Sequence, residues 1–261
     1  MRLSLRLIPL LALVISLCSV AQERVVSSLG RLEPENGVVQ LAGPSGGGLT
    51  GAVMKSLEVA EGDWVESGQV VARLDSYNLR KAEVARLEAI LTNARNEITR
   101  QKDLAKRSLT STANLDAAQM GLDIALADLA AAEASLELSV VRSPLRAQVL
   151  EILAYPGERV GPEGIMELGR TDRMYAVAEV YETDITKVKV GQLANVRMSA
   201  MDTELTGKVE RIALKVGRLD AVGTDPIAKT DARVVEVFIL LDDSAAVSRF
   251  TNMQVKVEIQ P

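Results

Sequence analysis

The chain has 261 residues, of which 48% are hydrophobic, 25% are charged and only 3% are aromatic. It is too apolar for a disordered protein and too charged for one that crosses a membrane many times. Its net charge is −5 and it contains no histidine, so we expect no imidazole base, no histidine-bound metal and no nucleic-acid partner.

Residues 1–21 have the pattern of a secretory signal peptide. Two arginines precede an apolar run over residues 7–17, and Ser19 and Ala21 are small residues at the positions that signal peptidase reads. Cleavage after Ala21 removes Cys18, the only cysteine. The alternative is that the segment stays as an anchor in the inner membrane. In either case we expect an exported body without disulfide or thiol chemistry.

Residues 22–75 are rich in glycine and in β-branched residues, which predicts short strands joined by turns. The segment 58–75 reads EVAEGDWVESGQVVARLD and contains a Gly62-Asp63 turn, Val65 two residues later and then Gly68. Glycine is expected at such turns because it adopts the left-handed backbone conformation at no steric cost.

A block of 64 residues, 76–139, contains none of the eight prolines and only one of the 18 glycines. Because both residue types interrupt helices, the block is predicted to be helical. Apolar residues recur at spacings of three and four in both of its halves, as in a heptad seam. The polar segment 108–112 separates the halves, which predicts two antiparallel helices with Ser111 or Thr112 capping the second. The seam residues are Val84, Leu87, Leu91, Ala94, Ile98 and Ala105, with Gln101 as a polar member, then Leu115, Ala118, Leu122, Ala125, Leu129, Ala132 and Leu136.

The segment after the helical block repeats the earlier turn pattern. Residues 140–168 contain a Gly157-Glu158 turn, Val160 two residues later and then Gly161. Residues 170–261 show alternating apolar and polar positions in several short runs, which favours a small β-barrel. The predicted strands cover residues 175–180, 193–198, 206–212, 234–241 and 255–259.

The paired turn motifs resemble the two halves of a biotinyl- or lipoyl-carrier domain, and the helical block stands where such carriers have a tight hairpin. This arrangement resembles the periplasmic membrane fusion proteins, the HlyD-type adaptors of Gram-negative exporters, from about residue 24 to the end. The segments SLGRLEPENGVVQL (28–41) and DPIAKTDARVVEV (225–237) are closer still to DevB-type adaptors, which serve ABC exporters.

The resemblance implies an α+β multi-domain fold, in which a split lipoyl-like β-sandwich carries an inserted antiparallel α-helical hairpin and a small β-barrel follows. The sequence departs from the family pattern at its end: it stops at Pro261, after the expected last barrel strand, so we expect the membrane-proximal domain of many adaptors to be absent or reduced to the strand near residues 25–32. The implied segments are a signal peptide at 1–21, a strand and first sandwich half at 22–75, the hairpin at 76–139, the second half at 140–169 and the barrel at 170–261.

The resemblance further implies a protein that is not an enzyme and needs no cofactor. Copies of the chain, six in number, would form a ring and tube in the periplasm that connects an inner-membrane ABC transporter to a TolC-like outer-membrane channel. ATP hydrolysis would belong to the transporter, because the chain has no G-x-x-x-x-G-K-[ST] loop.

Three alternatives remain open. The first is the adaptor of an RND-type efflux pump. A second is a lipoyl or biotinyl carrier subunit of an enzyme, which is disfavoured because Lys55 of the Val53-Met54-Lys55 sequence precedes the first turn motif. The third is an exported structural coiled coil, which the flanking β modules disfavour.

Arg100, Leu104 and Ser111 have the spacing of the tip motif by which many adaptors of this family dock onto the channel. Arg100 and Leu104 lie four residues apart and so share a helix face, and Ser111 lies where the chain turns back. The competing interpretation is a solvated arginine, a core leucine and a helix cap. Glu163 stands where some adaptors carry a pore-facing residue, which implies an acidic ring.

Overall fold

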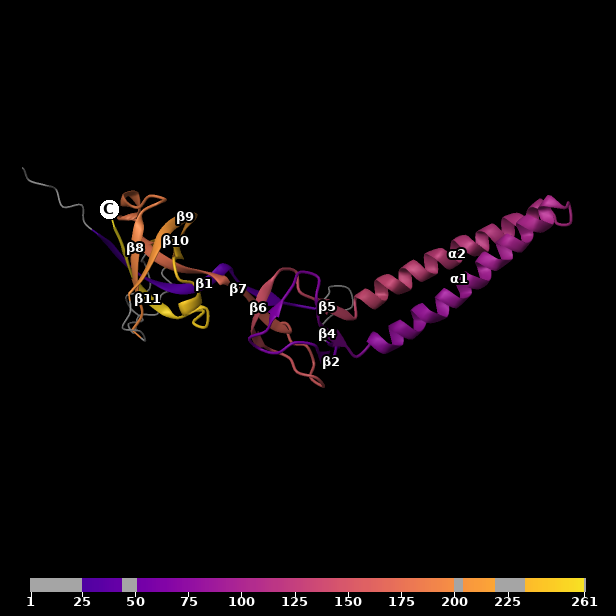
Figure 1. Ribbon diagram of the computed structural model, residues 1–261, viewed down its shortest axis with the longest axis horizontal. Coiled ribbons are helices and arrows are strands. Elements are labelled where there is room, and N and C mark those ends of the chain that lie inside the picture. The colour runs from indigo at the N-terminus through magenta and orange to yellow at the C-terminus, as the bar shows by residue number, and fades with distance from the viewer. Residues whose placement is uncertain (1–24, 44–50, 200–203, 219–232, 261) are drawn as a thin grey trace, which may run out of the picture.

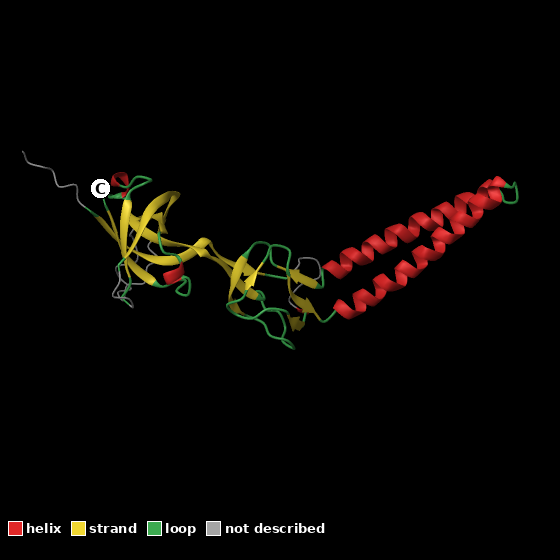
Figure 2. Cartoon of the chain, viewed as in Figure 1, coloured by secondary structure: helices red, strands yellow, loops and turns green. Residues whose placement is uncertain are grey.

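The computed structural model describes residues 25–43, 51–199, 204–218 and 233–260. The predicted signal segment 1–21 lies outside these ranges. The molecule is elongated, with a β-barrel at one end, a smaller β domain in the middle and a helical hairpin that projects from the other end (Figure 1). Figure 2 shows that the long helices are confined to the hairpin and the strands to the other two parts. The predicted α+β multi-domain fold with an inserted hairpin is therefore confirmed.

Six antiparallel strands form the barrel. Their order is β1-β11-β8-β9-β10-β7, and β1 also pairs with β7, so the sheet closes on itself. Apolar side chains from all six strands fill the interior, Leu32, Ala176 and Val257 among them. The strands are β1 (Val26–Leu41), β7 (Met166–Tyr181), β8 (Leu193–Arg197), β9 (Leu205–Arg218), β10 (Arg233–Leu241) and β11 (Gln254–Ile259), with short 3-10 turns at Ile185–Lys187 and Ala245–Val247.

The strand near residues 25–32 belongs to the barrel and is not the remnant of another domain. Val26 pairs with Ile259 on β11, and Leu32 pairs with Ala176 on β7. Without this strand the barrel would have two open edges, whose unpaired backbone groups would be exposed to pairing with other chains. The start of the described chain therefore closes a domain whose other strands follow the hairpin.

Strands β1 and β7 are long enough to run from the barrel into the middle domain. They pair with each other over both domains, with register shifts between Pro34 and Glu35 and between Glu35 and Val39. Asn36 and Gly37 both have positive φ at this irregularity, 67° and 76°. The two domains are therefore joined by a bent, hydrogen-bonded ribbon of two strands rather than by a single linker.

The middle domain is made of two interlocked halves, one before and one after the hairpin. The N–H of Gly62 donates to the carbonyl of Val149, and the N–H of Gly157 donates to the carbonyl of Met54, each at 2.8 Å. Gly62 and Gly157 have positive φ, as the sequence predicts. The strands are β2 (Met54–Leu57), β3 (Trp64–Val65), β4 (Val70–Leu74), β5 (Val140–Arg142) and β6 (Ala147–Ile152).

The two halves also use the same turn. In the first, the Asp63 carboxylate accepts from the N–H of Ala60 at 2.8 Å, and in the second the Glu158 carboxylate accepts from the N–H of Tyr155 at 2.8 Å. The acidic residue after each turn glycine thus fixes the preceding loop. The repeated Gly-acid pattern in the sequence reflects this shared local structure.

The hairpin consists of α1 (Tyr77–Lys106) and α2 (Thr112–Glu137). Every predicted seam residue is buried or half-buried, from Val84 to Ala105 on α1 and from Leu115 to Leu136 on α2. Most of the remaining helix surface is exposed. Leucine and isoleucine on α1 face many alanines on α2, which lets the two helices approach closely along a narrow seam.

Gly30 shows how tightly β1 is inserted beside β7. A Cβ atom at this position would lie 2.3 Å from the carbonyl oxygen of Val177. We predict that Gly30→Ala destabilises the barrel by about 1–3 kcal/mol, because the backbone must move to relieve the overlap. Gly217→Ala on β9 is the control, since no heavy atom lies within 4 Å of its added Cβ. Urea unfolding measures the difference, and equal midpoints for the two variants would contradict this account.

Candidate functional site at the hairpin tip

The tip is shaped by the way α1 ends. The N–H of Ser108 donates to the carbonyl of Ala105 and the N–H of Leu109 donates to the carbonyl of Leu104, both at 2.9 Å. Ser108 has φ of +58°. This pair of hydrogen bonds around a left-handed residue is the Schellman pattern, in which glycine is the usual left-handed residue. The serine turns the chain sharply away from α1 and toward α2.

A polar cluster ties the returning loop to α1. The Thr110 hydroxyl donates to the side-chain oxygen of Gln101 at 2.7 Å, and the Gln101 amide donates to Glu97 at 2.8 Å. The Asn114 amide donates to Thr110 at 3.4 Å. Gln101 is the one polar member of the predicted seam, and this contact explains it. Sequence reasoning noted the polar residue but missed its partner, because Thr110 lies in a segment without helical periodicity.

The structure places all three predicted tip residues in the last two turns of α1 or at the start of α2. Arg100 is exposed at 69% of its side chain and its guanidinium pairs with Glu97. Leu104 is half-buried. Ser111 caps α2, since its hydroxyl accepts from the N–H of Asn114 at 3.2 Å. The cap expected at Ser111 or Thr112 is thus Ser111.

Leu109 is a further tip residue that the sequence analysis did not single out. Its side chain is 66% exposed at the extreme end of the hairpin, between Leu104 and Ser111 in sequence. At this position the leucine side chain is not buried in a hydrophobic core, so its apolar surface does not stabilise the fold. The end of the hairpin thus exposes an apolar side chain at Leu109 and a cation at Arg100, two groups that suit contact with helices of another protein.

Glu163 lies elsewhere. It is exposed in a tight turn in which the N–H of Gly164 donates to the carbonyl of Gly161 at 3.2 Å. Gly164 has positive φ, and an added Cβ would lie 2.9 Å from the carbonyl oxygen of Leu41. The turn is therefore fixed against the middle domain, and Glu163 does not share a site with the hairpin tip.

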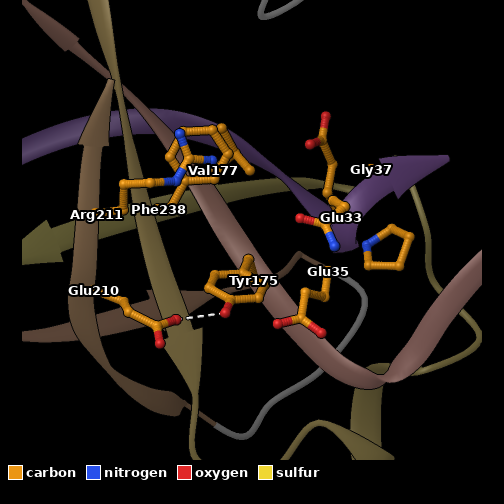
Figure 3. Close-up of a pocket in the computed structure, with 10 residues that line it drawn as sticks. Glu33, Glu35, Gly37, Tyr175, Val177, Glu210, Arg211 and Phe238 are labelled. Atoms are coloured by element: carbon orange, nitrogen blue, oxygen red, sulfur yellow. Dashed lines mark hydrogen bonds between the residues drawn. The ribbon is translucent and has the colours of Figure 1, made fainter. Parts of the chain in front are cut away.

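A cavity of about 650 Å³ lies at the joint between the barrel and the middle domain (Figure 3). In it, Glu35 and Glu210 flank Tyr175, whose hydroxyl donates to Glu210. Arg173 pairs with Glu35 at 3.0 Å and with Glu210 at 3.2 Å. Burial and the hydrogen bond to Glu210 raise the pKa of Tyr175 to about 12. These carboxylates are neutralised within the protein, so the cavity has the character of a structural joint.

Within the described ranges, no group of three histidine, cysteine, aspartate or glutamate residues could hold a metal ion. The helices in the same ranges are all too short or too polar to cross a membrane. The exposed side chains of Arg100 and Leu109 make the hairpin tip the candidate functional site.

The hairpin sequence matches a known family. Residues 76–140 match the family described as the RND MFP alpha-helical hairpin domain. The chain is 27% identical over 240 residues to the pyoverdine export membrane fusion protein PvdR of Pseudomonas aeruginosa, covering 80% of this chain and 58% of that protein. It is 26% identical over 226 residues to the multidrug resistance protein MdtA of Klebsiella pneumoniae, covering 78% of this chain and 53% of that protein. The chain thus spans a little over half the length of these relatives.

Solved structures of membrane fusion proteins share the fold. A MacA–MexA chimera that carries the Pseudomonas aeruginosa MexA hairpin superposes with a TM-score of 0.71 at 19% identity, covering 91% of this chain and 81% of the chimera. A membrane fusion protein of Streptococcus pneumoniae superposes with a TM-score of 0.65 at 18% identity, covering 90% of this chain and 98% of its own.

Ser108 offers a direct test of the tip geometry. We predict that Ser108→Gly stabilises the turn by about 1 kcal/mol, because an L-residue with a side chain is strained in the left-handed region. Amide hydrogen exchange of the tip should slow by about fivefold, the change that corresponds to 1 kcal/mol. Ser108→Ala is the control and should give no gain. Equal slowing in both variants would show that loss of the hydroxyl, rather than backbone freedom, is responsible.

Proposed function

We propose that this chain, a membrane fusion protein by its hairpin sequence and its fold, acts as the adaptor subunit of a tripartite exporter. In this function it is not an enzyme and needs no cofactor. It lies in the periplasm, associated with the inner membrane, and connects an inner-membrane transporter to a TolC-like outer-membrane channel. Copies of the chain, six in a ring, enclose the path of the substrate.

The observation that carries the proposal is the projecting hairpin with its exposed tip. Helix α1 has 30 residues, so the hairpin extends about 45 Å beyond the β domains. Arg100 and Leu109 are both exposed near its end. A long, narrow element of this kind buries little of its own surface. We infer that the function of the hairpin is to hold its tip at a distance from the barrel.

The chemistry of the tip suits docking against helix ends. Arg100 can offer its guanidinium donors to carbonyls and carboxylates of a channel, and Leu104 and Leu109 supply apolar surface beside it. The pair that Arg100 forms with Glu97 lies three residues apart on an exposed face. Such surface pairs contribute little stability, less than about 1 kcal/mol, so the arginine can exchange Glu97 for a partner at small cost.

Ser111 has two roles in this proposal. It caps α2 by accepting from the N–H of Asn114, and its side chain is exposed, as contact with a channel requires. A large residue here would both remove the cap and obstruct the approach of a second protein.

Glu163 is proposed to face the lumen of the ring, where repeated copies would form an acidic constriction.

For the transporter we propose an ABC type, since the segments 28–41 and 225–237 resemble DevB-type adaptors. The first segment lies in β1, and most of the second lies outside the described residues. The second candidate is an RND pump, which the match of residues 76–140 to the RND hairpin family favours. Adjacent genes for an ABC permease and ATPase would support the first candidate. An adjacent RND pump gene would overturn it.

Docking is tested by cross-linking the tip to the channel in cells. We predict that Arg100→Asp and Ser111→Arg each reduce cross-linking by at least about tenfold, because the first reverses the docking charge and the second obstructs contact. Arg86→Asp is the matched control, since Arg86 is also exposed and also pairs with a glutamate three residues earlier, but lies near the base of the hairpin. Unchanged cross-linking in both tip variants, with the proteins folded, would refute docking at this site.

A further inference from the structure

Large apolar side chains of the β domains are exposed mainly at the end of the barrel farthest from the hairpin. The C-terminus and the start of β1 lie together at this end (Figure 1), where Val26 pairs with Ile259. Among the described residues of the two β domains, nine large apolar ones are exposed, and only Trp64 and Tyr155 belong to the middle domain. Exposed apolar residues that gather in one place mark a contact surface. The other seven lie in the far half of the barrel and are Val25, Leu29, Tyr181, Val190, Leu193, Leu214 and Val216.

The loop between β7 and β8 presents one of these side chains from a fixed turn. The Gln192 side chain accepts from the N–H of Lys189 at 2.7 Å. The N–H of Gly191 donates to the carbonyl of Val209 on β9 at 2.8 Å. Val190 lies between these contacts and is 64% exposed. The turn thus holds an apolar side chain in solvent, where it adds nothing to the barrel core.

Two further apolar side chains flank the C-terminal strand at the rim. The N–H of Gln260 donates to the carbonyl of Leu193 at 2.8 Å, and Ile259 pairs with Val26 on the other side. Val25 and Leu193 are therefore two strand spacings apart, about 10 Å. Val25 is 50% exposed and Leu193 is 58% exposed. Together with Val190 they give this rim several separate apolar contacts.

Lysines stand beside these apolar residues. Lys208 on β9 is paired in register with Leu193, and Lys189 directly precedes Val190. Both lysines are exposed, and neither forms an ion pair with another described residue. A lysine can lay its apolar stem against a lipid layer while its ammonium group reaches the phosphates.

The tyrosine at this end has the same dual character. Tyr181 is the last residue of β7 and is 46% exposed. Tyrosine is enriched where an apolar phase meets water, because its ring is apolar and its hydroxyl is polar. The acidic residues of the loop that follows are Glu182, which is exposed, and Asp184, which pairs with Lys187 at 2.5 Å.

The predicted signal or anchor segment also leads into this end of the barrel. Its apolar run, 7–17, is separated from Val25 by the seven residues 18–24. Seven residues span at most about 25 Å when fully extended. An uncleaved segment would therefore hold the barrel end close to the bilayer. After cleavage at Ala21, the barrel end itself would have to supply the membrane contact.

A lipid surface fits this arrangement better than a groove on another protein does. The exposed side chains come from the starts of β1 and β8, the end of β7, the loop between β7 and β8, and β9. Protein partners are usually bound through anchors gathered in one packed centre. A layer of lipid headgroups accepts separate apolar side chains with lysines beside them.

We infer that the barrel end formed by Val25, Tyr181, Val190 and Leu193 is a membrane-contact surface, which rests on the phospholipid headgroups of the inner membrane. The inference rests on the proposed function and deepens it by naming how the adaptor sits on that membrane. Its apolar side chains enter the interface and its lysines meet the phosphates, so contact strengthens with anionic lipid. The hairpin then points away from the membrane, because it projects from the opposite end of the molecule (Figure 1).

Fluorescence quenching in lipid vesicles tests the contact. In a Cys18→Ser background, the full-length V190C, L193C and L126C proteins are labelled with an environment-sensitive fluorophore. L126C is the control, since Leu126 is exposed on the hairpin. In vesicles of phosphatidylethanolamine and phosphatidylglycerol, we expect headgroup spin labels to quench the two barrel positions at least about fivefold more than the hairpin position. Equal quenching at all three positions, or none at the barrel positions, would overturn the inference.

An acidic substitution tests whether the apolar residues make the contact. Adding L193D to labelled V190C should reduce its quenching about tenfold, because an aspartate is repelled by anionic headgroups and stays in water. Y155D is the matched control, since Tyr155 is a similarly exposed apolar residue of the middle domain. Circular dichroism checks that both variants are folded. Equal losses in the two variants, or no loss with L193D, would contradict the inference.

A protein partner at the same surface gives a different result. Cross-linking of V190C to the transporter in cells, with no lipid quenching at this position, would show that a protein covers the barrel end. That outcome would also overturn the inference.

The outcome is separable from that of the tip experiment, because Val190 and Leu193 are not part of the docking motif at Arg100 and Ser111. Absence of lipid quenching with continued, tip-dependent cross-linking to the channel would refute this inference alone. Lipid quenching at the barrel end with channel cross-linking that ignores both tip substitutions would refute the proposed function instead.

Discussion

The narrow seam between α1 and α2 is the constraint on which the rest of the molecule depends. It pairs Leu87, Leu91 and Ile98 with a helix whose buried residues, Ala125 and Ala132, are small. A seam of this width holds two long helices together but does not enclose them. Most of the hairpin surface therefore stays exposed, and the side chains on that surface are available to bind other molecules.

The β domains hold this hairpin through shared strands rather than flexible linkers. Strands β1 and β7 pair along both domains, and Arg173 bridges Glu35 on β1 and Glu210 on β9 close to the bend. The two ends of the hairpin enter the middle domain through β4 and β5, which are themselves paired. The hairpin is thus attached through one sheet of the middle domain, and the barrel is attached through the other.

Local patterns predicted the elements well, but not the pairings between distant segments. Five of the six barrel strands and both helices follow from periodicity, since the repeat of apolar residues indicates which face is buried. That β1 closes the barrel beside β11 could not be predicted in this way, because 233 residues separate Val26 from its partner Ile259 and alternation does not identify a partner strand. The turn at the tip was predicted within residues 108–112, but Ser108 was not identified as its left-handed residue because glycine is the recognisable signal for that position.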